Sequence, residues 1–229
     1  MNNLAIIPAR SGSKGLKDKN IKELGGMPLL AYSVQAALKS GEFSHVMVST
    51  DSAEYARIAE ESGAEVPFLR DASNASDVAS SWDVVREVLN KYRQMGIVFD
   101  TVTLLQPTSP LRTAEDIQNT YRMFREKNAT SIVAVCEMEH SPLWSNTLPE
   151  DLSMNGFLSN ATNRQRQQLS TYYRINGAIY IVDVENFLAG KDIYGAGSFA
   201  YVMPAERSID IDTALDFTIA EAVLNSLEK

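Results

Sequence analysis

The stretch LAIIPARSGSKG, residues 4–15, decides the fold because it joins a buried strand to a loop of small and basic residues. Leu4 to Ile7 are typical of a buried strand, which a proline then ends. Arg10, Lys14 and Lys19 follow within ten positions. In an open α/β sheet ligands lie at the carboxyl ends of the strands, where small residues let backbone amides approach phosphate oxygens. The alternative is a solvated turn with unrelated basic residues, but three cations directly after a buried strand favour an anion site.

Outward from this strand, short apolar runs alternate with longer segments of helical period. This alternation is typical of a three-layer α/β/α domain with a mainly parallel, Rossmann-like sheet, and each crossover is long enough for one helix. No internal repeat or linker marks a second domain, so we expect one domain over residues 1–229. The further expected strands are 45–49, 65–69, 101–105, 131–136, 178–182 and 199–203, and the expected helices are 28–39, 52–62, 80–94, 113–127 and 213–227.

Composition narrows the class of protein. The chain has 229 residues, 45% of them hydrophobic, which is enough for one large core. A net charge of -8 argues against a nucleic-acid partner, whereas a few cations in one cleft suffice for a small anionic substrate. Cys136 is the only cysteine and lies in an apolar run, which favours a buried hydrophobic role over a nucleophilic one. No apolar run reaches membrane-spanning length, so we expect no membrane association and a cytoplasmic location.

The rhythm of strands and helices breaks between about residues 137 and 172. That stretch is polar and contains Pro142, Pro149 and Gly156. It is too long for an ordinary loop inside a compact domain. We therefore expect an inserted excursion that is either functional or disordered.

Two carboxylates stand close together near the carboxyl end of the chain, in the segment SIDIDT, residues 208–213. Alternate side chains of an extended segment share a face, so Asp210 and Asp212 point the same way. Mg²⁺ commonly binds one or two carboxylates together with substrate phosphates. The competing interpretation is that Asp212 caps the last helix, which leaves Asp210 unexplained; both roles can coexist.

Two further segments carry polar groups that can bind a substrate. The turn QPTSPLR, residues 106–112, projects Gln106, Thr108 and Ser109 from a strand end, although it could equally be only a rigid turn. Arg166 and Arg174 are suited to bidentate recognition of a carboxylate or phosphate, and solvated surface arginines are an equally good interpretation of each alone.

The chemistry that these groups support is transfer of a phosphoryl or nucleotidyl group. The first loop matches neither the P-loop pattern nor the dinucleotide fingerprint. His45 and His140 show no catalytic partner, and no nucleophile stands with a base. Cations and paired carboxylates therefore indicate catalysis by positioning and charge stabilisation.

Seven ordered motifs resemble the acylneuraminate cytidylyltransferases, or CMP-sialic acid synthetases, over nearly the whole chain. They are IPARSGSKG at residues 7–15, KN at 19–20, STD at 49–51, SDVASS at 76–81, LQPTSPLR at 105–112, NGAIY at 176–180 and SIDID at 208–212.

The resemblance implies that CTP and a nine-carbon 2-keto acid sugar react to give a CMP-sugar and pyrophosphate, with Mg²⁺ as cofactor. It assigns the catalytic roles to Arg10, Lys19, Asp210 and Asp212, the last two as metal ligands. The implied nucleotide-binding residues are Ala9, Arg10, Ser13, Lys19, Asn20, Arg70 and Ser81, and the implied sugar-binding residues are Gln106, Arg166, Arg174, Asn176 and Tyr180.

The resemblance also implies a homodimer in which the 137–172 excursion reaches the partner's active site. Some family members carry proline where this chain has Ser170, and residues 16–19 also differ from their pattern. Legionaminic and pseudaminic acids are therefore alternatives to sialic acid. An eight-carbon acid (Kdo) cytidylyltransferase and a non-catalytic nucleotide-binding module of the same fold are the remaining alternatives.

Overall fold

The computed structural model describes residues 1–12, 15–71, 74, 80–158 and 169–227, which form a six-stranded sheet in the order β4-β1-β5-β7-β6-β8. Neighbours β4-β1, β1-β5 and β6-β8 are parallel, whereas β7 runs antiparallel to both β5 and β6. The expected α/β class with a mainly parallel sheet is confirmed. The strands are β1 (Asn3–Pro8), β4 (His45–Ser49), β5 (Thr101–Leu104), β6 (Ser131–Glu137), β7 (Tyr173–Asp183) and β8 (Ser198–Val202).

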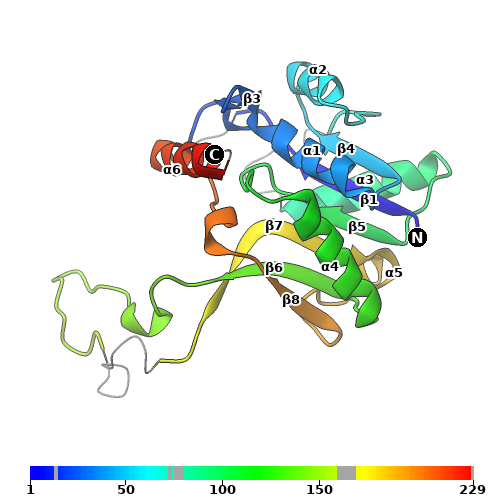
Figure 1. The fold of residues 1–229 in the computed structure, drawn as a ribbon. Helices are drawn as coiled ribbons and strands as arrows, with labels where there is room; N and C mark the ends of the chain where they lie inside the picture. Colours follow the sequence, from blue (N-terminus) through cyan, green and yellow to red (C-terminus); the bar gives the residue numbers. More distant parts are fainter. Residues whose placement is uncertain (13–14, 72–73, 75–79, 159–168, 228–229) are drawn as a thin grey trace.

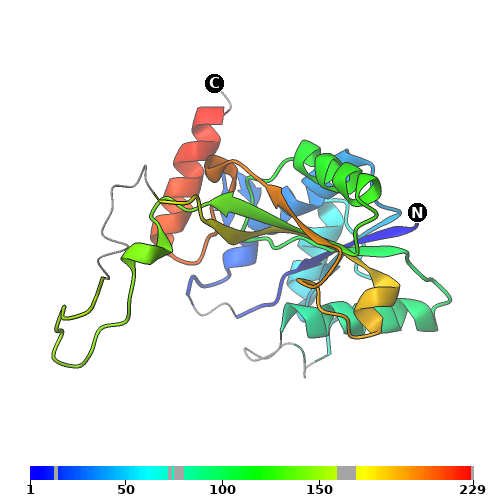
Figure 2. The ribbon, with the colours of Figure 1, turned by 90° about the horizontal axis from the view of Figure 1, so that it is seen from below.

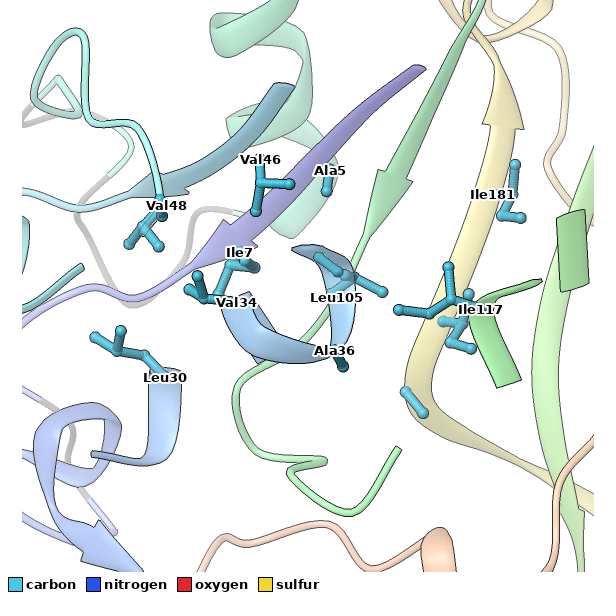
Figure 3. Packing of buried hydrophobic residues seen from close by; sticks show 14 of the residues in the cluster. Ala5, Ile7, Leu30, Val34, Ala36, Val46, Val48, Leu105, Ile117 and Ile181 are labelled. Atoms are coloured by element: carbon cyan, nitrogen blue, oxygen red, sulfur yellow. The ribbon is translucent and has the colours of Figure 1, made fainter. Parts of the chain in front are cut away.

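Helices cover both faces of this sheet and make three layers (Figures 1 and 2). Alternate residues of β1 serve the two faces, because successive side chains of a strand point to opposite sides. Ala5 and Ile7 pack with α1 (Leu29–Ser40), α2 (Ala53–Glu61) and α4 (Ala114–Glu126) in the core shown in Figure 3. Leu4 and Ile6 pack with α3 (Ser81–Gln94) and α5 (Val184–Leu188).

The closing helix α6 (Ala214–Leu227) lies beside a small hairpin of β2 (Glu23–Leu24) and β3 (Met27–Pro28). Phe217 and Ala220 of α6 are buried in a third apolar cluster with Leu24 and Ile211. A single 3-10 turn, η1 (Lys19–Ile21), precedes the hairpin. The C-terminal helix is thus packed against the segment that follows the first loop.

Local sequence signals set the ends of the helices. Ser80 and Asp83 form a capping box at the start of α3, and Thr113 and Asp116 form another at the start of α4. Helix α1 ends at Gly41, whose φ of 68° lies in the left-handed region that glycine tolerates. Each N-terminal cap contributes on the order of 1 kcal/mol to the stability of its helix.

One expected strand is wrong, and another is longer than expected. Residues 65–69 form no strand; only Glu65 makes an isolated bridge, to Met47, because Pro67 two residues later has no N–H to continue a ladder. Strand β7 begins at Tyr173, five residues before the expected start.

An irregular widening of β7 accounts for the missed start of that strand. Val133 of β6 pairs with Tyr180, but Val135 pairs with Ile175. Residues 176–179 of β7 therefore lie opposite the single residue Ala134, an irregular bulge larger than the ordinary two-to-one kind. The bulge breaks the alternation that marks a strand in sequence, and it moves part of β7 toward the turn after β5.

The excursion leaves the sheet between β6 and β7 and projects away from the body of the molecule (Figure 1). The amide of Met138 donates to the carbonyl of Tyr172 at 2.9 Å and closes its base. Its described residues are irregular apart from the single turn η3 (Pro142–Trp144). Within the described ranges, none of the helices combines the length and apolar character that a membrane crossing requires.

Candidate active site

A cleft of about 650 Å³ lies at the carboxyl ends of β1 and β5. This is where ligands bind in open α/β sheets, and the volume suits a nucleotide-sized molecule. Residues from all of the sequence-predicted groups meet on its wall. Those that line it are Arg10, Lys19, Asn20, Arg70, Ser81, Gln106, Asp210 and Asp212.

The loop after β1 is held in place by hydrogen bonds at both of its ends. Asp51, just beyond β4, accepts from the amide and the hydroxyl of Ser11, each at 2.8 Å. Burial opposes the charge of Asp51, but the bonds from Ser11, together with a further backbone hydrogen bond and the charge of Arg70, lower the pKa of Asp51. Farther along, Asn20 donates to the carbonyl of Arg10 at 3.1 Å. Arg10 is thus presented to the cleft from a pinned backbone.

Lys19 joins this loop to the acidic pair from the far end of the chain. Its Nζ lies 2.9 Å from Asp212 Oδ1 and donates to the carbonyl of Ile211 at 2.7 Å. The Lys19 side chain is 11% exposed and that of Asp212 73% exposed. The approach is close because residue 15 is glycine: a Cβ there would stand 2.7 Å from the carbonyl oxygen of Asp212.

Asp210 has an oxygen that finds no protein partner. The buried Oδ1 accepts no hydrogen bond from any described residue, although the Thr108 side chain bonds to the carboxylate. Burial first, and then the charge of Asp212, raise the pKa of Asp210. An ionised carboxylate in this position is costly unless a cation meets it.

The donor set at this point fits a hard divalent cation. Asp210 and Asp212 both line the cleft, and two carboxylates completed by substrate phosphates are typical of Mg²⁺. The described residues contain no cluster of three or more His, Cys, Asp or Glu side chains, so a purely protein-held metal cage is not present among them. Capping does not compete for Asp212, because Thr213 and Asp216 cap α6 instead.

Arg70 and Ser81 form the opposite wall. Arg70 is 8% exposed and donates to the carbonyl of Ser49 at 2.6 Å and to its hydroxyl at 3.1 Å. Burial lowers the pKa of Arg70. Ser81 is the first residue of α3, so the partial positive end of that helix also faces the cleft.

Four predicted residues do not line the cleft. Ala9 is fully buried, and its amide donates to the carbonyl of Ser49. Arg174 is exposed and donates to the carbonyl of Ser208 at 3.0 Å. Tyr180 packs edge-on against Trp82. Asn176 is 1% exposed and donates to the hydroxyl of Ser208 at 2.9 Å. Ser13 and Arg166 lie outside the described residues.

Sequence comparison identifies the family. Residues 4–229 match the family described as "Cytidylyltransferase". The chain belongs to the cytidylyltransferase family. This membership agrees with a cleft that combines a cationic loop and paired carboxylates.

Curated relatives extend along most of the chain. It is 37% identical over 217 residues to "N-acylneuraminate cytidylyltransferase" of Escherichia coli O18:K1:H7, covering 95% of this chain but 51% of the relative. The chain therefore spans about half the length of that protein. It is 34% identical to "CMP-N,N'-diacetyllegionaminic acid synthase" of Legionella pneumophila, covering 96% of this chain and 95% of the relative. It is 33% identical to "Pseudaminic acid cytidylyltransferase" of Campylobacter jejuni, with coverages of 96% and 95%.

Solved structures share the cytidylyltransferase fold at low sequence identity. The CTP complex of CMP:2-keto-3-deoxy-manno-octonic acid synthetase superposes with a TM-score of 0.74 at 17% identity, covering 99% of this chain and all of the other. The 4-diphosphocytidyl-2C-methyl-D-erythritol synthase of Anaerococcus prevotii gives 0.65 at 15% identity, with 98% of each chain covered. At such identities the likeness concerns the fold alone.

Proposed function

We propose that this protein joins CTP to a nine-carbon 2-keto acid sugar, an N-acylneuraminate or a close relative, and releases pyrophosphate in a Mg²⁺-dependent reaction. One observation carries the proposal: Lys19 links a pinned cationic loop to a carboxylate pair, one oxygen of which is buried without a partner. Family membership and the named relatives, which carry the names of acylneuraminate, legionaminic acid and pseudaminic acid enzymes, support it.

The nucleotide would lie between the first loop and the start of α3. Arg10 and Lys19 neutralise the triphosphate, and Asn20 holds the loop. Ser13, which lies outside the described residues, stays a prediction for the same group. Arg70 and Ser81 face the cytosine side of the cleft, together with the backbone around Ala9. Fixed donors of this kind favour the transition state because they need no reorganisation as charge develops.

The transfer step forms one bond and breaks one bond. The anomeric hydroxyl oxygen of the sugar attacks the α-phosphorus, and the bond from that phosphorus to the bridging oxygen breaks to release pyrophosphate. Asp210 is proposed to accept the hydroxyl proton as the reaction's general base. Mg²⁺ held by Asp210 and Asp212 would supply charge neutralisation for the departing pyrophosphate.

The acidic sugar would occupy the side of the cleft bounded by Gln106. Arg174 and Arg166 are proposed to meet its carboxylate, which a guanidinium fork matches well. Arg174 lies close to the segment 208–212 that carries Asp210 and Asp212, through its bond to the carbonyl of Ser208. That Asn176 and Tyr180 bind the sugar stays a prediction. Because both side chains are buried, they would support the residues that line this side of the cleft.

A homodimer is the state that the excursion supports. Leu148, Leu152 and Met154 are all more than half exposed, and so is Tyr173 at its base. Solvated monomers rarely carry so many apolar side chains on one projecting segment. We propose that a second copy covers them and that each excursion completes the partner's active site. Replacing Leu148 and Met154 with Asp would then give a monomer of low activity by light scattering and assay; a fully active monomer refutes this assignment.

The test of the function is a product assay by mass spectrometry. The protein is incubated with CTP, Mg²⁺ and, separately, N-acetylneuraminate, legionaminate, pseudaminate and the eight-carbon acid Kdo. We expect a CMP conjugate of a nine-carbon acid together with pyrophosphate, and near-complete loss of product in Asp212→Asn with the fold intact. Preferred turnover of the eight-carbon acid would assign the Kdo alternative, and CTP binding with no product from any acid would favour the non-catalytic module.

A further inference from the structure

Gln106 lies directly against the bulge of β7. A Cβ built on Gly177 would stand 2.4 Å from Gln106 Oε1 and 3.3 Å from Ser109 Oγ, so the two side chains lie over the bare glycine. Gly177 also has a φ of +75°, which L side chains rarely adopt. The place of the Gln106 side chain in the cleft therefore depends on where the bulge stands.

One buried side chain fixes the turn after β5 and the bulge to each other. Arg112 donates from Nε to the carbonyl of Ala178 at 2.7 Å and from a terminal nitrogen to the carbonyl of Gln106. Its other terminal nitrogen donates to the hydroxyl of Ser33 on α1 at 2.7 Å. Only a forked guanidinium reaches three acceptors on three separate segments.

The burial of this cation has a cost that a purely space-filling residue would avoid. Arg112 is 3% exposed, and burial lowers its pKa to about 9. Its acceptors among the described residues are two carbonyls and a hydroxyl. Asp116, the acid whose charge acts on Arg112, is itself paired with Arg207 at 2.8 Å. A buried cation without a contacting carboxylate is tolerated where its hydrogen bonds hold something in place.

We infer that Arg112 is a positioning residue, which acts through Gln106 by clamping the turn after β5 onto the Gly177 bulge and so setting the sugar side of the cleft. The inference rests on the proposed function for its effect on catalysis, but its geometry does not. Asn176 serves the same bulge from the other side, because its Oδ1 accepts from the amide of Ala178 and its amide group bonds Ser208.

A double-mutant cycle tests whether Arg112 acts through Gln106. Arg112→Lys keeps the charge but loses the fork, and we expect kcat/KM for the acidic sugar to fall about 10- to 100-fold, with KM for CTP essentially unchanged. In a Gln106→Ala background the same change should cost less than about 3-fold, since the group that it positions is gone. Gly177→Ala, which displaces Gln106 and strains the bulge while leaving the Arg112 side chain itself unchanged, should mimic the effect.

Tyr121→Phe is the matched control. Tyr121 is fully buried and bonds Thr101 and Thr103 on β5 at 2.9 and 2.8 Å, so its loss weakens the same strand without reaching Gln106. Its effects should be the same with and without Gln106. Equal losses for Arg112→Lys in both backgrounds, or parallel losses toward CTP and the sugar, overturn the inference.

A structural readout keeps this test separate from the proposed function. The side-chain amide signals of Gln106 in a ¹H-¹⁵N spectrum, identified by their absence in Gln106→Ala, should shift in Arg112→Lys and Gly177→Ala but not in Tyr121→Phe. Unshifted signals refute the positioning role whatever the activity. Shifted signals in a protein that turns over no acid would support the clamp and refute the proposed function.

Discussion

Replacing Asp210 with Asn should stabilise the metal-free protein while removing its response to Mg²⁺. In the free protein the carboxylate is a liability: one oxygen is buried without a partner, and burial and Asp212 together raise its pKa. Asparagine keeps the shape and a partner for Thr108, and it removes the charge. The gain in stability and the loss of function would then have the same origin.

The size of the gain follows from the penalty for an unsatisfied buried polar group, about 1–3 kcal/mol. An amide at the same place still lacks one partner, so we expect the lower end, about 1 kcal/mol. For a domain of this length, that corresponds to a rise in Tm of about 2–4 °C. In the wild type, Mg²⁺ at ten times its Kd should add about 1.4 kcal/mol, whereas the variant should gain almost nothing.

The assay is urea unfolding in EDTA and in a Mg²⁺ series. Asp212→Asn is the control, because it is not expected to raise the free energy of unfolding. Asp212 is exposed and pairs with the more buried Lys19, so its loss should leave stability unchanged or lower it by up to about 1 kcal/mol. If Asp210→Asn is less stable than the wild type in EDTA, or still responds to Mg²⁺, then Asp210 is a structural acceptor and the argument for a cation site fails.

Three further perturbations follow from individual contacts. Arg207→Gln leaves Asp116, which is 1% exposed, without its 2.8 Å partner and should lower the free energy of unfolding by about 3 kcal/mol at neutral pH. The folded pKa of Asp116 is lowered from 3.8, so the difference in stability between the wild type and the variant should shrink in urea titrations as pH falls below 3.8. A difference that stays constant with pH would contradict this reasoning. Asp51→Ala unpins Ser11 and should raise KM for CTP more than KM for the sugar, with a loss of about 1–2 kcal/mol in unfolding free energy; an unchanged KM for CTP would show that the loop needs no pin. Gly15→Ala places a Cβ 2.7 Å from the Asp212 carbonyl, so it should part the loop from the acidic pair and reduce kcat, and a crystal structure with the Lys19–Asp212 contact intact would count against this reasoning.

Sequence alone predicts those parts of the fold that depend on local patterns. The buried runs and helical periods placed β1, β4, β5 and β6 and their helices, because burial on both faces of a sheet leaves a mark within each segment. The direction of β7 has no such mark, since it depends on which neighbours the strand meets. The bulge at residues 176–179 also escaped, because it interrupts the alternation that identifies a strand.

The site divides in the same way. Arg10, Lys19, Asp210 and Asp212 were predictable because charged residues directly after a buried strand, or two apart in an extended segment, have few structural uses. Asp51 was visible only as part of a motif; its bonds to Ser11 span 40 positions and depend on β1 and β4 being neighbours. The buried position of the Asn176 side chain likewise depends on its hydrogen bond to Ser208, 32 positions away. Contacts of this kind appear only when the chain is folded.

The link between Lys19 and Asp212 gives the cleft a property that neither wall has alone. In the free protein the ammonium offsets the charge of one carboxylate and also bonds the carbonyl of Ile211, so the acidic pair is held while no ligand is near. A phosphate that draws Lys19 toward itself leaves Asp212 with its full charge beside the unpartnered oxygen of Asp210. We therefore expect binding of an anion on one wall to strengthen the attraction of the other wall for a cation. By linkage the reverse should hold as well, so we expect a triphosphate and a divalent metal ion to bind more tightly together than apart.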